Sequence, residues 1–128
     1  MADVNRGNRP LSPHATIYRW PLNAILSITF RVTGIALSFA SVLVVWWFLA
    51  AATSPGYFAT ADAVLTSVIG DIVLTLALAA LWFHFCNGIR HLIWDTGSWF
   101  GGARVHASGI AALAATAVLT VLTLYVAA

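Results

Sequence analysis

The segment HFCNGIRHLIWD, residues 84–95, lies at the end of a long apolar stretch. It nevertheless contains two histidines, an arginine and an aspartate. His84 and His91 are seven residues apart, so at about 100° per residue they share one helix face, with Gly88 between them. A haem iron ligand needs a neutral imidazole nitrogen in an apolar pocket, and a glycine on the same face leaves room for a neighbouring helix or for a flat macrocycle. His84 is therefore the candidate axial ligand. The alternatives are a bond from His84 to a neighbouring helix and simple hydration of His91 at the membrane interface.

Ser27 and Arg31 are a second pair of polar side chains that could act together, because positions i and i+4 lie on the same side of a helix. An arginine inside an apolar segment can face a bound anion or a polar head such as a quinone carbonyl, or it can be a snorkelling anchor. Asp95 can pair with Arg31 or Arg90, or relay protons. Asp71 is predicted to be a hydrated group near a helix end.

The composition sets the environment of these groups. Hydrophobic residues make up 61% of the 128-residue chain and charged residues only 8%, with six arginines, four aspartates, no lysine and no glutamate. A soluble domain carries about 25% charged residues, so the composition indicates a membrane protein. The scattered arginines form no patch for nucleic acid. The single cysteine excludes an internal disulfide and a CxxC site, and the polar N-terminal segment predicts no cleaved secretory signal.

Three apolar segments are each long enough for the roughly 20 residues that cross a bilayer. The sequence thus predicts an all-α integral membrane protein whose single domain, residues 1–128, has three transmembrane helices in a larger helical bundle. The helices are expected near 22–52, 62–95 and 104–127, after a tail at 1–21. Pro21 is expected to start the first helix. The breaks between helices are expected at Ser54-Pro55-Gly56 and at Gly101-Gly102.

The arginines predict the orientation. All six lie in or towards the N-terminal tail and the 95–104 loop: Arg6, Arg9, Arg19, Arg31, Arg90 and Arg104. The 52–61 connection and the C-terminus contain none. The positive-inside rule then puts the N-terminus in the cytoplasm. We expect a multi-pass protein of a bacterial inner membrane, whose C-terminus after three spans lies in the periplasm.

Three motifs together resemble one family. RPLSPHATIY (9–18), SITFRVTG (27–34) and HFCNGIRHLIWD (84–95) occur in the order and spacing of the cytochrome b membrane-anchor subunit of succinate dehydrogenase, respiratory complex II. The resemblance covers essentially the whole chain. It implies a subunit of an enzyme that passes electrons from succinate to quinone, with no dicarboxylate chemistry in this chain itself.

The resemblance also implies the partners and the site residues. The chain would anchor a flavoprotein and an iron-sulfur subunit to the membrane and share one haem b with a second small anchor subunit. His84 matches the family's haem ligand, and Ser27 and Arg31 match its quinone-site residues, Arg31 also lying near the haem propionates. His91 and Asp95 match positions near the propionates and the quinone. Many members have a histidine where this chain has Phe30, so the propionate contacts remain open.

Two other functions are compatible with the same residues: a haem-free structural anchor, and the cytochrome b anchor of another quinone-linked enzyme, such as a formate dehydrogenase or hydrogenase. The latter usually needs two histidines at membrane depth on different helices. Here His14 precedes the first helix, His91 shares the face of His84, and His106 opens the last helix about 10 Å too shallow. The sixth haem ligand is therefore expected from another polypeptide.

Overall fold

The structure is a computed structural model that describes residues 14–127, and every regular element in that range is an α-helix. The helices are α1 (Leu22–Thr53), α2 (Pro55–Leu65), α3 (Val68–Asp95) and α4 (Gly102–Ala127). By length and composition, α1, α3 and α4 can each cross a membrane. The predicted all-α membrane fold with three spanning helices is confirmed. Arg6, Arg9 and the first half of the RPLSPHATIY motif lie outside the described residues.

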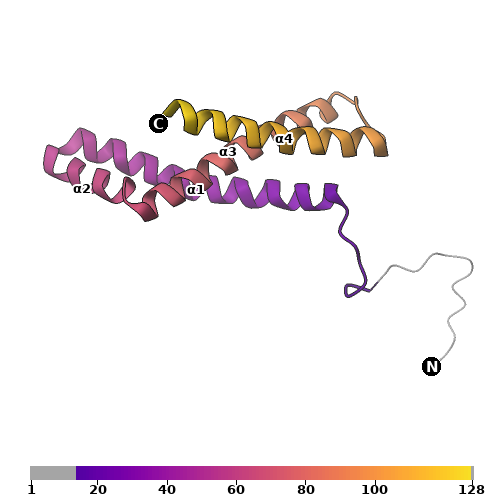
Figure 1. Ribbon diagram of the computed structural model, residues 1–128, viewed down its shortest axis with the longest axis horizontal. Helices are drawn as coiled ribbons and strands as arrows, with labels where there is room; N and C mark the ends of the chain where they lie inside the picture. Colours follow the sequence, from indigo (N-terminus) through magenta and orange to yellow (C-terminus); the bar gives the residue numbers. More distant parts are fainter. Residues whose placement is uncertain (1–13, 128) are drawn as a thin grey trace, which may run out of the picture.

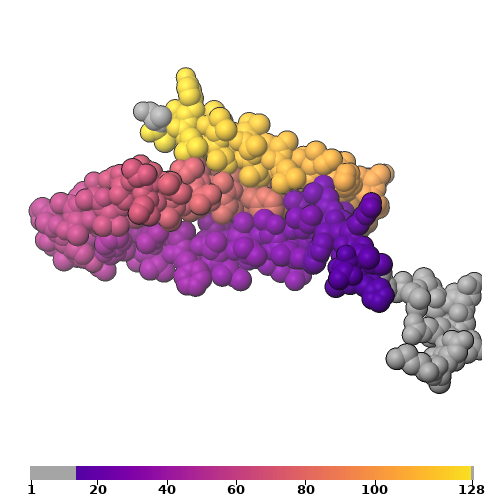
Figure 2. Space-filling model, turned by 60° about the horizontal axis from the view of Figure 1, so that its bottom comes forward, coloured from indigo at the N-terminus to yellow at the C-terminus, as the bar shows by residue number. Residues whose placement is uncertain are grey.

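Figure 1 shows how these helices are arranged. Residues 14–21 and the 96–101 loop lie at one end of the molecule, which we call the tail end, while α2 and the end of α4 lie towards the other, the far end. The helix α3 packs against both α1 and α4. Figure 2 shows α1, in purple, along one side of the elongated body and α4, in orange to yellow, along the other.

The second predicted helix, 62–95, is wrong in its first part, because the chain breaks there into α2 and α3. Ser67 caps α3 by accepting a hydrogen bond from the Gly70 N–H at 3.1 Å. A side chain at Gly70 would collide with the Leu65 carbonyl oxygen, so the tight turn into α3 depends on this glycine. Ser54 caps α2 in the same way, with Pro55 in its first turn. The short α2 therefore folds back against α1 at the far end.

At the tail end, the loop between α3 and α4 uses left-handed backbone conformations. Gly97 and Gly101 have positive φ angles of 76° and 122°, and Trp99 also has a positive φ, 64°. The predicted break at Gly101-Gly102 matches the start of α4 at Gly102. Asp71 lies in the first turn of α3, as expected of a helix-end group, where an acidic side chain complements the helix dipole.

The interior of this chain is small. Its buried apolar residues are Leu26, Ala50, Ala61, Leu65, Phe83 and Ala112, while dozens of large apolar side chains face outward. One close contact between α1 and α4 uses a glycine, since a Cβ at Gly109 would come within 2.7 Å of Leu26 Cδ1. Apolar surfaces of this extent are covered by lipid and by other membrane helices.

Candidate functional site

His84 of α3 is held at its Nδ1 atom by α1. Nδ1 lies 3.1 Å from the Phe30 carbonyl oxygen and 3.3 Å from the Thr33 hydroxyl oxygen. The Thr33 hydroxyl donates to the same carbonyl at 2.9 Å, so its oxygen presents a lone pair to the imidazole. Both neighbours are then acceptors, and this network selects the tautomer with the proton on Nδ1. Nε2 keeps its lone pair and has no hydrogen-bond partner among residues 14–127.

The imidazole of His84 is also enclosed by carbon atoms of α1. Its ring stacks on Phe30, with 4.1 Å between centroids and 10° between planes. Its Cε1 edge faces Gly34, where a Cβ atom would approach to 3.0 Å. The imidazole is therefore half-buried in a mainly apolar setting.

His91 lies on the same side of α3 as His84, as the seven-residue spacing predicts. The Phe30 ring contacts both histidines, and its centroid is 4.9 Å from that of His91. The other neighbour of His91 is Trp94, in an edge-to-face contact at 5.1 Å. Gly88, between the two histidines, has open space beside it, since an added Cβ would meet nothing within 4 Å. The chain thus leaves an unfilled strip along this face.

Ser27 and Arg31 lie on the side of α1 that holds His84. At about 100° per residue, positions 27, 30, 31 and 34 fall within one arc of α1, so both side chains flank the residues that hold His84. Ser27 is half-buried and Arg31 is exposed. Within residues 14–127, neither the Ser27 hydroxyl nor the Arg31 guanidinium has a hydrogen-bond partner.

Asp95 is exposed at the last residue of α3, at the tail end. Of the roles considered for Asp95, pairing with Arg90 does not occur, because Arg90 points its guanidinium into the protein. Arg90 is 6% exposed and donates to Ser108 Oγ at 2.9 Å, Asn23 Oδ1 at 2.9 Å and the Val105 carbonyl at 2.8 Å. Asn87, itself buried, lies at 3.5 Å, and Trp94 stacks on the guanidinium at 4.2 Å.

This arginine was missed by the sequence reasoning, which treated it as an orientation signal. Asn23 belongs to α1, Asn87 to α3, and Ser108 and Val105 to α4, so Arg90 ties the three spanning helices together near the tail end. The available signal was the row of polar residues at 87, 90 and 91 in an apolar helix. Its role here is structural, because its donors are used within the chain.

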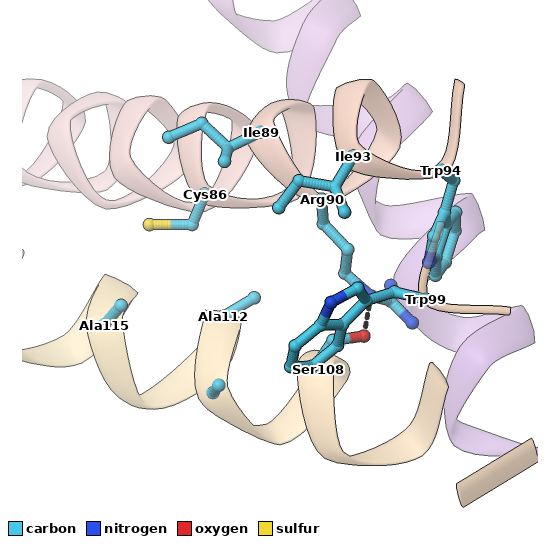
Figure 3. Close-up of a pocket in the computed structure, with 10 residues that line it drawn as sticks. Cys86, Ile89, Arg90, Ile93, Trp94, Trp99, Ser108, Ala112 and Ala115 are labelled. Carbon is cyan, nitrogen blue, oxygen red and sulfur yellow. Dashed lines mark hydrogen bonds between the residues drawn. The ribbon is translucent and has the colours of Figure 1, made fainter. Parts of the chain in front are cut away.

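A cavity of about 340 Å³ lies between α3 and α4, close to Arg90 (Figure 3). It is lined by Cys86, Ile89, Arg90, Ile93, Trp94, Trp99, Ser108, Ala111, Ala112 and Ala115. Figure 3 shows Arg90 and Ser108 joined by a hydrogen bond at its edge, while the remaining lining is almost wholly apolar. No residue of α1 lines it, so it is separate from the candidate site formed by α1 and α3.

The described residues contain no cluster of three or more histidine, cysteine or acidic side chains that could bind a metal ion. Two aspartates at the far end, Asp62 and Asp71, line a second hollow, and Asp62 accepts a hydrogen bond from Trp47 at 3.2 Å. Among residues 14–127, Nε2 of His84 is a ring nitrogen without a hydrogen-bond partner that could bind the iron of a haem, a group that does not need such a cluster.

The comparison with known proteins decides the family. Residues 5–123 match the profile of the succinate dehydrogenase/fumarate reductase transmembrane subunit. The chain belongs to this family. It is 54% identical over 126 residues to a succinate dehydrogenase cytochrome b556 subunit of Paracoccus denitrificans, covering 98% of this chain and 97% of that protein. The cytochrome b556 subunit of Rickettsia bellii is 39% identical over 114 residues, covering 89% of each chain. The mitochondrial cytochrome b560 subunit of Bos taurus is 43% identical over 120 residues, covering 90% of this chain and 67% of that one.

The predicted resemblance is thereby confirmed, and with it the class of protein: a membrane subunit of an enzyme complex. The residues that bind a cofactor or a substrate follow from neither the profile nor the names of the relatives.

Proposed function

We propose that this chain is the haem b- and quinone-binding anchor of a succinate dehydrogenase complex, with His84 Nε2 as an axial iron ligand. The bond from His84 to a neighbouring helix, the alternative considered from the sequence, is present, but it uses Nδ1 alone. The observation that carries the proposal is that the Phe30 carbonyl and Thr33 hold Nδ1 while Nε2 has no partner among residues 14–127. Iron-ligating histidines typically donate their second ring N–H in this way, which fixes the tautomer and makes the ligand more basic. The names of the Paracoccus and Bos relatives, cytochromes b, support a haem.

The surroundings of His84 fit such a group. The imidazole is in an apolar setting, and the strip beside Gly88 has room that no described side chain fills. When bound, haem b supplies a one-electron carrier inside the membrane. A second ligand from this chain is not available among its described residues, because His91 shares the face of His84 and His14 and His106 are exposed outside the α1–α3 contact. We therefore assign the second ligand to another anchor subunit.

Ser27 and Arg31 are proposed to bind the quinone head group. A guanidinium near a quinone oxygen stabilises the negative charge that develops there during reduction, and a hydroxyl can donate to a carbonyl oxygen. Both residues lie towards the tail end of α1, next to the His84 face. Asp95, exposed at the same end, is in a position to hold or pass on a proton. Arg31 and His91 are the candidate partners of the haem propionates.

The arrangement also suggests the partners and the orientation. We place the tail end on the cytoplasmic side of a bacterial inner membrane, because the arginines gather there. Iron-sulfur and flavoprotein subunits bound at this end would deliver electrons close to Ser27 and Arg31, with the shortest path to the quinone. The dicarboxylate chemistry would belong to those soluble subunits.

The decisive experiment is the spectrum of a His84→Leu variant, produced with all subunits of the complex. The reduced-minus-oxidised spectrum is expected to lose the low-spin b-type signal, while succinate-dependent reduction of a water-soluble dye shows that the soluble subunits are still active. His106→Leu, at an exposed histidine on α4, is the matched control. A low-spin signal of wild-type intensity in His84→Leu refutes the ligand, and absence of haem from the wild-type complex supports the haem-free anchor instead.

A further inference from the structure

We propose that Phe30, Thr33 and Gly34 are positioning residues for the His84 imidazole, and that together they set the angle of its ring plane and its strength as an iron ligand. We call these three residues of α1 the α1 clamp. The inference rests on the proposed function of His84, and it assigns a role to residues that do not themselves reach the iron.

Each member of the α1 clamp restricts a different movement of the ring. The Phe30 side chain covers one ring face, at 10° from parallel, and so prevents tilting. The Phe30 carbonyl and the Thr33 hydroxyl hold Nδ1, which prevents rotation of the ring by a half-turn. Gly34 faces the Cε1 edge and sets how deeply the ring sits against α1.

The α1 clamp occupies little more than one helical turn, since its residues are at positions i, i+3 and i+4. Thr33 Oγ donates to the Phe30 carbonyl at 2.9 Å, so the two acceptors of the imidazole N–H also hold each other in place. The α1 clamp is therefore a rigid support for the imidazole ring. It also gives Phe30 a role in this chain where other members of the family have a histidine: its ring packs on both His84 and His91.

The consequence for the iron follows from the chemistry of imidazole ligands. The hydrogen bond from Nδ1 to a carbonyl adds negative character to the ring and stabilises the ferric state. The orientation of the ring plane affects the low-spin electron paramagnetic resonance (EPR) signal. A change that moves the ring away from α1 is therefore expected to weaken the hydrogen bond and shift the haem midpoint potential in the positive direction.

Gly34→Ala makes this change with a single methyl group. The added Cβ would lie 3.0 Å from Cε1, closer than van der Waals contact, and 4.0 Å from Nε2. The ring must move away by a few tenths of an ångström, which lengthens the 3.1 Å contact between Nδ1 and the Phe30 oxygen. Gly102→Ala is the matched control, because an added Cβ there meets nothing within 4 Å.

The experiment is a redox titration and a low-temperature EPR spectrum of the complete complex carrying each variant. Gly34→Ala is expected to give a positive shift of the haem potential and a displaced low-spin signal, and Gly102→Ala to match the wild type. The inference is overturned if Gly34→Ala retains both the wild-type potential and the wild-type signal. That result leaves the role of His84 intact, because His84→Leu tests the ligand separately.

A second variant guards against failure of Gly34→Ala to assemble. Phe30→Leu removes the stacking ring but keeps the backbone carbonyl and adds no bulk at Gly34. It is expected to broaden or displace the low-spin signal because the ring plane is no longer held near parallel. An unchanged signal in Phe30→Leu contradicts the positioning role of its ring.

Discussion

Replacing Arg90 by methionine tests whether the buried guanidinium holds the three spanning helices together. Methionine keeps much of the length of the side chain but has no donors. The variant loses the bonds to Ser108 at 2.9 Å, to Asn23 at 2.9 Å and to the Val105 carbonyl at 2.8 Å. The contact with Asn87, at 3.5 Å, is at the limit of a hydrogen bond and adds little.

The expected loss follows from these contacts. Hydrogen bonds between helices in membranes contribute about 0.6 kcal/mol on average and up to about 1.7. Three of them, together with a stacking contact on Trp94 of about 0.5–2 kcal/mol, give roughly 2–7 kcal/mol. Removing the charge relieves part of its desolvation cost, which acts in the opposite direction. We expect a net decrease of about 2–4 kcal/mol in the free energy of unfolding.

The assay is unfolding of the detergent-solubilised complex by increasing fractions of a denaturing detergent, followed by helical circular dichroism. Arg104→Met is the control, because Arg104 is exposed in the first turn of α4 and its loss is expected to change stability by less than about 0.5 kcal/mol. Asn23→Ala and Ser108→Ala should each give a smaller loss than Arg90→Met. If Arg90→Met is as stable as Arg104→Met, Arg90 does not tie the helices together.

Four further predictions concern the site, the topology, the cofactor and the fold. Ser27→Ala and Arg31→Leu are expected to slow quinone reduction by the complex while leaving succinate-dependent dye reduction intact. A reporter fused after Ala128 should give a periplasmic readout, because three spans follow the N-terminus that we propose to be cytoplasmic. Purified without its partners, the chain should bind haem weakly or in a five-coordinate or symmetrised dimeric form, and co-expression should restore a low-spin spectrum. Gly70→Ala should lower the free energy of unfolding by more than about 1 kcal/mol, because the added Cβ would collide with backbone oxygens in the α2–α3 turn.

Each of these has a control and a contrary outcome. Ser38→Ala and Arg104→Leu remove the same groups elsewhere, and equal quinone reduction in all four variants would exclude Ser27 and Arg31 from the site. A cytoplasmic readout after the last helix would mean that one span is miscounted. A stable bis-histidine haem in a monomer of this chain would contradict the need for a partner's ligand. Gly56→Ala, with open space around it, is the control for Gly70→Ala, and equal stability of the two would contradict a steric role.

The sequence by itself determined the membrane class and the number of spans, because the lengths of the apolar segments and the arginine positions depend on no tertiary contact. The shared face of His84 and His91 also followed from helical periodicity alone. The break before α3 was missed, although Ser67 and Asp71 are residues favoured at a helix start, since the apolar run continues across it.

The tertiary structure decided which residues meet. The spanning helices are apolar on all sides, so no amphipathic pattern marks the side that faces another helix. The contact of His84 with Phe30, Thr33 and Gly34 depends on how α1 and α3 cross, and a single-helix pattern does not contain that information. The burial of Arg90 has the same cause. An arginine near the end of an apolar helix has the same spacing whether it reaches outward to the interface or inward to Asn23 and Ser108, and only helix packing separates the two.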